Sequence, residues 1–483
     1  MKVARLPRLT AIATASALAF GCMVGPNYRR PDVTTPGSYR GVEAAAEEAS
    51  LADVPWWDVF RDPVLEALIQ EALAKNLDLQ VAAARVLEAR AQAGIARSFL
   101  FPEVGAAAGY GAEQVSRLSD PPQGADDKTY QNWNFGVNVS WELDLFGRIR
   151  REREAAVARY LATEEGRRAV LVTLIGDVAD SYFRLLELDL EIEIARRTLL
   201  LNDETIEFYR TRLEGGVSNR LEVDQAVANR AITAATIPEI ERQIAITENG
   251  LSVLLGRPPG PIERGVALSD QYLAPEIPAG IPATLLERRP DVVSAEHQLM
   301  AANADVGAAR ALFYPSIGLT GAFGGLSGSA SDLLKSDSIL WSVGAGLFQP
   351  LFQGGRIRRN VEAYEARYVQ AVAEYQKAAL NAYRDVADAL VTRRKLAEVR
   401  VEQETGVEAL RDASQLARSR YDNGLSNYLE VLIADQALFQ QELLLARTRG
   451  AELQAFAQIY RSLGGGWQFE GQAAAPAVAE PVE

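Results

Sequence analysis

The side chains best suited to nucleophilic or metal chemistry are scarce in this sequence, which contains a single cysteine and a single histidine. The cysteine is Cys22, so a disulfide within one chain is impossible. The histidine is His297, in a segment Ala-Glu-His-Gln-Leu that we expect to be helical, where a surface histidine is a better interpretation than a catalytic one. The sequence has no Gly-x-x-x-x-Gly-Lys-Ser/Thr loop and no dinucleotide fingerprint after a strand. We therefore predict that the protein is not an enzyme and binds no metal.

Cys22 stands where a lipid-attachment cysteine would stand. Residues 1–21 have a basic start and a short apolar run, which are typical of a secretory signal peptide. Gly21 before Cys22 is similar to the lipobox of bacterial lipoproteins, although Ala19-Phe20 replaces the usual Leu-Ala or Leu-Ser. We expect a covalent lipid on the Cys22 thiol as the only added group, with residues 22–63 forming a lipid-anchored N-terminal segment. The alternative is an incidental cysteine in an ordinary signal peptide.

The charge balance limits the possible partners. The chain of 483 residues has a formal net charge of −14, and loss of the basic signal peptide would make it more acidic. Nucleic-acid binding requires concentrated positive charge, so we expect no nucleic-acid partner. The balance suits a soluble surface or a pore that tolerates cations.

An internal duplication organises the sequence. Three separated blocks recur in the same order, at offsets of 213 residues for the first block and 208 for the others. The matching blocks are Asn76–Gly105 with Arg289–Gly318, Gly147–Arg151 with Gly355–Arg359, and Gly216–Asn219 with Gly424–Asn427. We predict a first repeat over residues 64–260 and a second over 261–467, followed by a disordered tail over 468–483, which is rich in alanine and proline.

Each repeat is predicted to begin with a helix and continue with two strands. In the first repeat the helix over residues 64–100 ends before Pro102, and in each repeat a strand follows in which apolar and small or polar residues alternate. Such alternation is typical of a membrane-barrel strand, and also of an amphipathic strand on a soluble core. The apolar faces are Phe135, Val137, Val139 and Trp141, then Trp341, Val343, Ala345 and Leu347; the other faces are Asn134, Asn138 and Ser140, then Ser342, Gly344 and Gly346.

A very long helix follows in each repeat. Residues 148–211 and 356–421 contain no proline, and 64 helical residues span on the order of 96 Å. Such a helix suits a coiled coil in a fibre or a rod that crosses the periplasm. Glycine and Ser or Asn then predict a turn and a cap before a return helix, which reaches about Gly256 or Gly464. The helices over 64–100 and 219–255, placed end to end, would match the long helix in length.

Four strands per chain are too few for a closed membrane barrel, which has at least about eight. An open sheet would expose unpaired backbone groups to lipid, which is prohibitively costly. A membrane protein of this pattern therefore requires an oligomer, and three chains with twelve strands are one solution.

The chain resembles the OprM/NodT branch of the TolC-like outer-membrane efflux proteins over roughly residues 22–467. The Glu-Leu-Asp-Leu-Phe-Gly and Arg-Arg-Pro-Asp segments are the more specific matches. The segments that carry the resemblance are Gly25–Tyr28, Trp56–Leu65, Glu142–Arg148, Leu286–Asp291, Gly307–Pro315 and Tyr421–Leu429.

The resemblance implies an α+β membrane protein, a homotrimer in which a 12-stranded β-barrel in the outer membrane continues as a long α-helical barrel into the periplasm. It also implies that the helix turns dock on a periplasmic membrane-fusion adaptor, which links to an inner-membrane transporter. The docking turns would be Gly216, Val217 and Ser218 in the first repeat and Gly424, Leu425 and Ser426 in the second.

In relatives, acidic residues just beyond this turn form a ring at the closed periplasmic end. Glu430 falls on such a position and Glu222 is its repeat counterpart, with Asp224 and Asp435 close by. Where some relatives have a second aspartate, this chain has Ile433. A carboxylate near a helix start is also common for purely local electrostatic reasons, so both interpretations of these residues stand.

Clusters of arginine begin both long helices, the end where the helix dipole disfavours positive charge. Phospholipid phosphates of the outer membrane could compensate them, but we favour neighbouring carboxylates. The arginines are Arg148, Arg150, Arg151, Arg356, Arg358 and Arg359, and the carboxylates are Glu152, Glu154 and Glu362.

The sequence and the resemblance together predict the outer-membrane channel subunit of a tripartite efflux system of the RND type, a passive exit duct for drugs or other small molecules. Two alternatives remain open: a channel of the same shape for type I protein secretion, and a periplasmic helical scaffold or adaptor that never enters the membrane.

Overall fold

The computed structural model describes residues 23–40, 50–114, 129–272, 280 and 282–465. The predicted signal peptide, Cys22 and the predicted tail lie outside the described residues. The chain divides into two compact units. The first combines residues 1–31, 86–163 and 295–375, and the second combines 32–85, 164–294 and 376–483.

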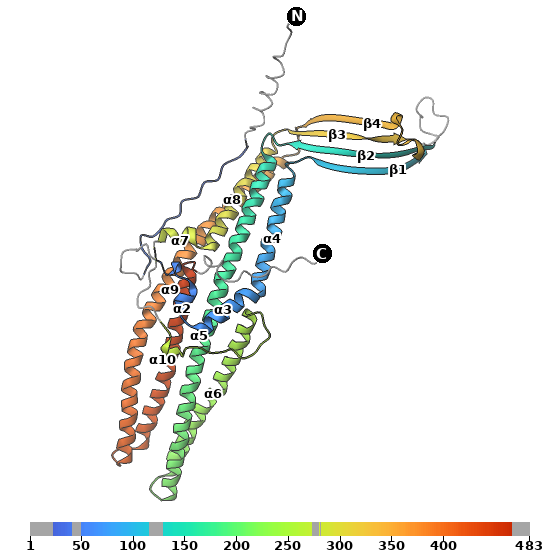
Figure 1. Ribbon diagram of the computed structural model, residues 1–483. Coiled ribbons are helices and arrows are strands. Elements are labelled where there is room, and N and C mark those ends of the chain that lie inside the picture. Colours follow the sequence, from blue (N-terminus) through green and yellow to red (C-terminus); the bar gives the residue numbers. More distant parts are fainter. Residues whose placement is uncertain (1–22, 41–49, 115–128, 273–279, 281, 466–483) are drawn as a thin grey trace. The chain divides into compact units, whose positions relative to one another are not determined.

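The order of elements in the first half of the chain recurs in the second half (Figure 1). The long helices α5 and α9 have 67 residues each, and the return helices α6 and α10 have 35 each. Within the described ranges, none of the helices combines the length and the hydropathy of a membrane-crossing segment. The main elements are α2 (Trp56–Phe60), α3 (Pro63–Lys75), α4 (Leu77–Ser98), β1 (Glu103–Gln114), β2 (Thr129–Leu143), α5 (Arg148–Glu214), α6 (Arg220–Leu254), α7 (Pro282–Arg288), α8 (Pro290–Ala311), β3 (Ser316–Ser327), β4 (Ile339–Phe348), α9 (Arg356–Asp422) and α10 (Tyr428–Ser462).

The first unit contains a four-stranded antiparallel sheet with the strand order β1-β2-β3-β4 (Figure 1). Its register aligns apolar positions across the strands: Val137 lies opposite Ala106 and Phe323, and Phe323 lies opposite Trp341. Because side chains alternate between the faces of a strand, these residues share one face. The strand faces predicted from the sequence are confirmed.

The helix expected over residues 64–100 is in fact two helices, α3 and α4, which are separated at Asn76. Asn76 has an extended backbone (φ −60°, ψ 129°), and its N–H donates to the carbonyl of Ala72 at 2.8 Å. Its side-chain Oδ1 accepts from the N–H of Leu79 at 2.9 Å. Asn76 therefore ends α3 and caps α4, which is a role that helical periodicity does not reveal.

The second unit brings together the ends of the short helices of each repeat. Asn76 Nδ2 donates to the carbonyl of Leu254, the last residue of α6, at 2.9 Å. At the equivalent place in the second repeat, Arg289 Nη1 donates to the carbonyl of Ser462, the last residue of α10, at 3.2 Å. These bonds satisfy helix-end carbonyls, which otherwise lack partners. In the first repeat the end of α6 thus meets the break between α3 and α4, and not an end of the single helix expected over residues 64–100.

The core of the second unit lies between the long and the return helices. One cluster joins Leu188 and Ile192 of α5 to Ile240 of α6 and to Phe439 and Leu443 of α10. Apolar residues at helical spacing along α5 are buried: Leu171, Leu174, Ile175, Val178, Tyr182, Leu185, Leu188 and Ile192.

The N-terminal strap, residues 23–30, is held against the first unit by two buried charged groups. The guanidinium of Arg151, which is 1 % exposed, donates to the carbonyl of Val24 at 3.3 Å and to Asn27 Oδ1 at 2.9 Å. The carboxylate of Glu296 accepts from the Tyr28 hydroxyl at 2.9 Å and from Arg30 Nε at 2.7 Å. The strap is thus fixed by hydrogen bonds along its length.

We predict that Gly256→Ala destabilises the helix-end junction far more than Gly216→Ala does. Both glycines have a positive φ, but a Cβ on Gly256 would lie 2.4 Å from the Lys75 carbonyl oxygen, whereas one on Gly216 would meet nothing within 4 Å. We expect the free energy of unfolding to fall by about 3 kcal/mol for Gly256→Ala and about 1 kcal/mol for Gly216→Ala. Urea unfolding in detergent, followed by far-ultraviolet circular dichroism, would measure both; equal losses would contradict the close approach.

Candidate functional site

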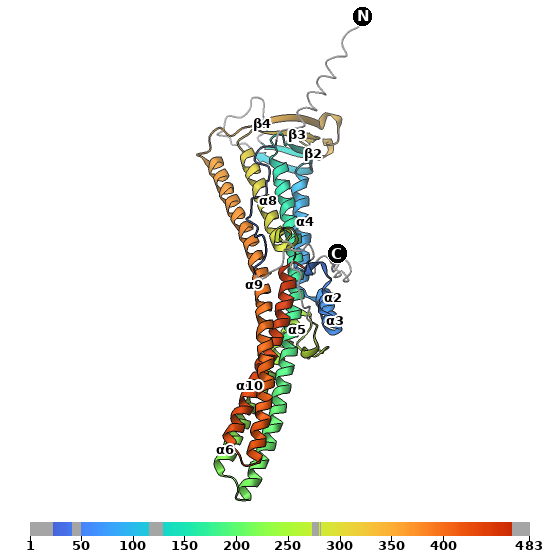
Figure 2. The same cartoon turned by 90° about the vertical axis from the view of Figure 1, so that its left-hand side faces the viewer.

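The helix turns of the second unit carry most of the predicted site residues. Figure 2 shows α5 joined to α6 and α9 joined to α10 at tight turns. Gly216 and Gly424 both have a φ of 71°, as expected for glycines that end a helix. Beyond them, the N–H of Val217 donates to the Arg212 carbonyl at 3.0 Å, and the N–H of Leu425 to the Arg420 carbonyl at 2.8 Å.

Asparagine caps the return helix at both turns. Asn219 Oδ1 accepts from the N–H of Glu222 at 3.1 Å, and Asn427 Oδ1 from the N–H of Glu430 at 3.3 Å. Of the two capping candidates in each turn, Ser or Asn, the asparagine is the N-cap. Ser218 instead donates its hydroxyl to the Glu222 carboxylate.

Apolar side chains project from both turns. Val217 is 66 % exposed and its repeat counterpart Leu425 is 69 % exposed. Leu221, Leu429 and Ile433, one turn further along the return helices, are also exposed. Clustered exposed apolar residues at the end of a helix pair are typical of a protein–protein contact.

The four predicted gate carboxylates fall into two groups. Glu430 and Asp224 are well exposed, and their ion pairs are long, at 3.7 Å to Arg420 and 3.6 Å to Arg220. Glu222 is half-buried. Exposed, loosely paired carboxylates can interact with ions or with neighbouring chains.

Asp435, in contrast, is bound within its own helix pair. Its carboxylate accepts from Arg418 Nη2 at 2.6 Å and from the Ser414 hydroxyl at 2.5 Å, which joins α9 to α10. The equivalent positions of the first repeat are Val227 for Asp435 and Ile206 for Ser414, so this polar link occurs in the second repeat only.

A tyrosine cluster packs between the two helix pairs. The ring of Tyr209 lies 5.6 Å from that of Tyr421 and 4.3 Å from that of Tyr428, and the guanidinium of Arg212 lies 5.3 Å from the centre of the Tyr421 ring. Burial raises the pKa of Tyr428 to about 12 and raises the pKa of Tyr209 and Tyr421 as well. The phenols therefore stay neutral at any physiological pH.

This cluster and the Asp435 pair were not predicted from the sequence. Tyr421 and Tyr428 entered only as parts of a family motif, and Ser414, Arg418 and Tyr209 were not considered. A position-by-position comparison of the repeats at the offset of 208 would have marked the polar link as a difference between the two copies.

Of the six arginines at the starts of the long helices, five are paired with carboxylates, as we favoured from the sequence, whereas Arg356 bonds Gln353. Arg148 bonds Glu152 at 2.8 Å, and Arg359 bonds Glu362 at 2.6 Å. Arg151 bonds Glu154, and Arg358 also bonds Glu362. Two further acceptors were missed: Glu142 for Arg148 and Asp144 for Arg150.

His297 and the acidic side chains are the remaining candidates for metal binding in the part of the chain that the structure describes. No group of three or more His, Cys, Asp or Glu residues could hold a metal ion there. His297 lies within α8, the helical setting expected for it.

Comparison with known proteins gives consistent matches over almost the whole chain. The family profile described as "Outer membrane efflux protein" matches residues 68–257 and 281–465. The cation efflux system protein CusC of Escherichia coli O6:H1 is 35% identical over 465 residues, covering 95% of this chain and 99% of CusC. The solvent efflux pump outer membrane protein SrpC of Pseudomonas putida is 36% identical over 456 residues, covering 92% and 96%.

Solved structures agree with these matches. The open state of the MtrE outer membrane channel of Neisseria gonorrhoeae has a TM-score of 0.84 and 30% identity, covering 92% of this chain and 99% of MtrE.

We predict that Asp435→Ala loosens the second helix turn, whereas Asp224→Ala does not. Loss of Asp435 leaves Arg418 and the buried Ser414 without their shared acceptor, which should cost about 1–2 kcal/mol. The exposed Asp224 should contribute less than about 0.5 kcal/mol. Hydrogen exchange over residues 410–440 would rise for Asp435→Ala alone; equal exchange in both variants would show that the buried link does not stabilise the turn.

Proposed function

Because this chain belongs to the outer membrane efflux protein family, we propose that it is the outer-membrane channel subunit of a tripartite efflux system. The observation that carries the proposal is the four-stranded sheet, which has one apolar face and two unpaired edges. The channel is a passive duct with no catalytic function. The names of relatives refer to cations in one case and to solvents in another, so membership of the family does not determine the cargo.

The apolar face of the sheet lies against lipid. Val343 is 81 % exposed and Trp341 is 73 % exposed, although both are large and apolar. At most positions, the opposite face of the same strands has small or polar side chains, such as Ser342 and Gly344 of β4 and Asn138 of β2. Apolar residues facing out and polar residues facing in are the pattern of a membrane barrel strand.

The edges of the sheet require other copies of the chain. Strands β1 and β4 are at the ends of the strand order, and each pairs with one neighbour only. In a bilayer the free edges must pair, and pairing β4 of one copy with β1 of the next closes a ring. A homotrimer supplies twelve strands, and its helices continue the ring as a helical barrel in the periplasm.

The turns at Gly216 and Gly424 are the contact with a periplasmic membrane-fusion adaptor, which links the channel to an inner-membrane transporter. Their exposed Val217 and Leu425 support an apolar contact. Glu222, Glu430 and Asp224 form the acidic ring of the periplasmic gate, while Asp435 holds the second turn together through Arg418.

A lipid on Cys22 anchors the subunit to the outer membrane. The next residue, Met23, is held at the junction of β2 and α5, where its Cα lies 3.0 Å from the position of a Cβ on Gly147. The N–H of Val24 donates to the Phe146 carbonyl at 3.1 Å. These contacts bring the start of the described chain to the end of a strand, where a lipid anchor would be useful.

The two alternatives make different predictions. A channel for type I protein secretion would have the same subunit structure but a different transporter, which the gene neighbourhood would identify. A periplasmic scaffold would not fractionate with the outer membrane and would not give the heat-modifiable gel mobility of a barrel.

We predict that Val343→Lys impairs assembly in the outer membrane, whereas Ser342→Lys at the adjacent position is tolerated. A lysine on the lipid face of a strand costs about 2–4 kcal/mol near the centre of the bilayer, and one on the other face points toward water. Heat-modifiable trimer in outer-membrane fractions would measure assembly. If both variants assemble equally well, the apolar face is not in lipid.

We also predict that Glu222→Gln combined with Glu430→Gln raises the single-channel conductance in planar bilayers and weakens block by divalent cations. Removing like charges from a ring lowers its affinity for cations and reduces a barrier at the mouth. Glu408→Gln, on the exposed surface of α9 away from the turn, is the matched control. Conductance and cation block unchanged from wild type in the double variant would eliminate these carboxylates from the gate.

A further inference from the structure

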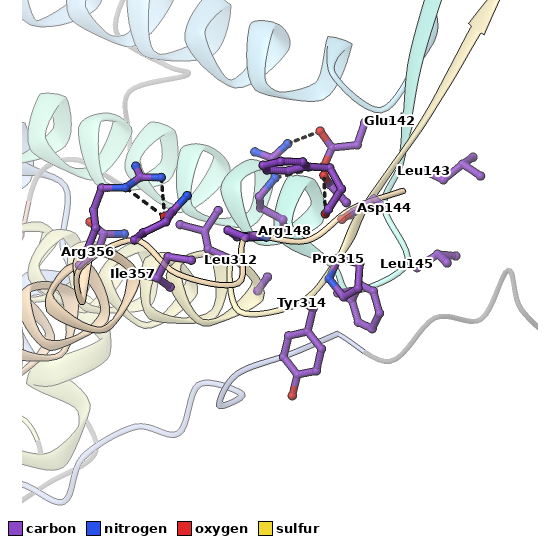
Figure 3. A pocket seen from close by; sticks show the side chains of 17 residues that line it. Glu142, Leu143, Asp144, Leu145, Arg148, Leu312, Tyr314, Pro315, Arg356 and Ile357 are labelled. Atoms are coloured by element: carbon purple, nitrogen blue, oxygen red, sulfur yellow. Dashed lines mark hydrogen bonds and ion pairs between the residues drawn. The ribbon is translucent and has the colours of Figure 1, made fainter. Parts of the chain in front are cut away.

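A cavity of about 530 Å³ lies in the first unit, where β2 and β4 end and α5 and α9 begin (Figure 3). Apolar side chains, including Leu312, Phe348 and Ile357, line part of it. Its charged lining consists of two guanidinium groups, Arg148 of α5 and Arg356 of α9, and of two carboxylates, Glu142 and Asp144, at the end of β2. These arginines are equivalent residues of the two repeats, 208 positions apart.

The two arginines differ in their partners. Arg148 bonds Glu142 and Glu152, each at 2.8 Å, so its charge is compensated within the protein (Figure 3 shows the bond to Glu142). Arg356 bonds the neutral side-chain oxygen of Gln353, at 2.7 and 3.1 Å, and no carboxylate among the described residues is paired with it.

The surroundings of Arg356 are also positive. Arg358 and Arg359 share the single carboxylate of Glu362, and their side chains are about four-fifths exposed. The first turn of α9 contains no acidic residue, so the positive end of the helix dipole adds to the excess. Positive charge is therefore in excess on the α9 side of the cavity, whereas the carboxylates of Glu142 and Asp144 lie on the side of β2 and α5.

Next to this positive group, the segment between β4 and α9 exposes two large apolar side chains. Leu351 is 93 % exposed and Phe352 is 89 % exposed, and their neighbours Pro350 and Gln353 line the cavity. An anionic group beside an apolar surface is the chemistry of an amphiphile, and the end of a membrane strand is the level of the lipid headgroups.

We propose that this cavity binds a membrane phospholipid, whose phosphate pairs with Arg356 and whose acyl chain lies along Phe348, Ile357 and the exposed Leu351 and Phe352. The site deepens the proposed function and rests on it, because the sheet must lie in the outer membrane. The first repeat has no such site on α5, because the guanidinium of Arg148 is already paired with the carboxylates of Glu142 and Glu152.

Native mass spectrometry of detergent-purified protein tests the site with phosphatidylglycerol as the probe. We expect Arg356→Gln to weaken phosphatidylglycerol binding about tenfold, which is the loss of one charge-assisted hydrogen bond. The matched control is Arg367→Gln, an exposed arginine further along α9, which should bind as wild type does. Diacylglycerol with the same acyl chains, which lacks the phosphate, should bind at least tenfold more weakly to the wild type, and millimolar inorganic phosphate should not displace the lipid.

Equal phosphatidylglycerol affinity of Arg356→Gln and wild type would overturn the site. Displacement of the lipid by inorganic phosphate alone would also overturn the site, because the cavity would then be an ion site. A variant that retains the lipid but loses trimer heat stability would overturn it as well, because the cavity would then be a contact between subunits. The conductance of the wild-type protein in the same preparation tests the proposed function separately: a wild type that forms no channel refutes the function, whereas a conducting wild type that binds no phospholipid refutes only the site.

Discussion

The backbone groups along the outer edges of β1 and β4 set the main constraint on this molecule. A strand at the edge of a sheet has a row of N–H and C=O groups that must find partners, and in hydrocarbon no water can supply them. The two edge strands have 12 and 10 residues, so many backbone N–H and C=O groups lack a partner within the sheet. One chain provides four strands, and in the homotrimer that we propose the remaining pairs come from the edge strands of other copies. In this proposal the sheet cannot lie in the membrane without the oligomer.

The two repeats share a backbone plan but differ in how their charges are compensated. At the starts of the long helices, Arg148 is enclosed by carboxylates whereas Arg356 is not. At the turns, Asp435 links α9 to α10 and has an apolar counterpart in the first repeat. A trimer of such chains would have six helix pairs, in which the pair of α5 and α6 alternates with the pair of α9 and α10. This difference allows one set of turns to be held more firmly than the other.

Sequence patterns predicted the elements whose residues repeat with a regular period. The two faces of β2 and β4 follow from local alternation, the long helices from long stretches without proline, and the turns from glycine with serine or asparagine. The break at Asn76 was missed because asparagine is tolerated in helices, and its role depends on the carbonyl of Leu254, far along the chain. The Asp435–Arg418 pair joins different helices, and the tyrosine cluster combines residues from both repeats. Such contacts depend on the packing of distant segments, which no local pattern encodes.

The N-terminal strap limits how far the fold can lie from the lipid that we propose on Cys22. Only Met23 separates Cys22 from Val24, whose N–H and carbonyl are both hydrogen-bonded to the first unit. The buried Arg151 and Glu296 hold the following residues down to Arg30. Such a short segment does not allow the folded chain to move away from the membrane surface. A lipid on Cys22 would instead fix the depth of the fold in the membrane to within the length of two residues, roughly 7 Å.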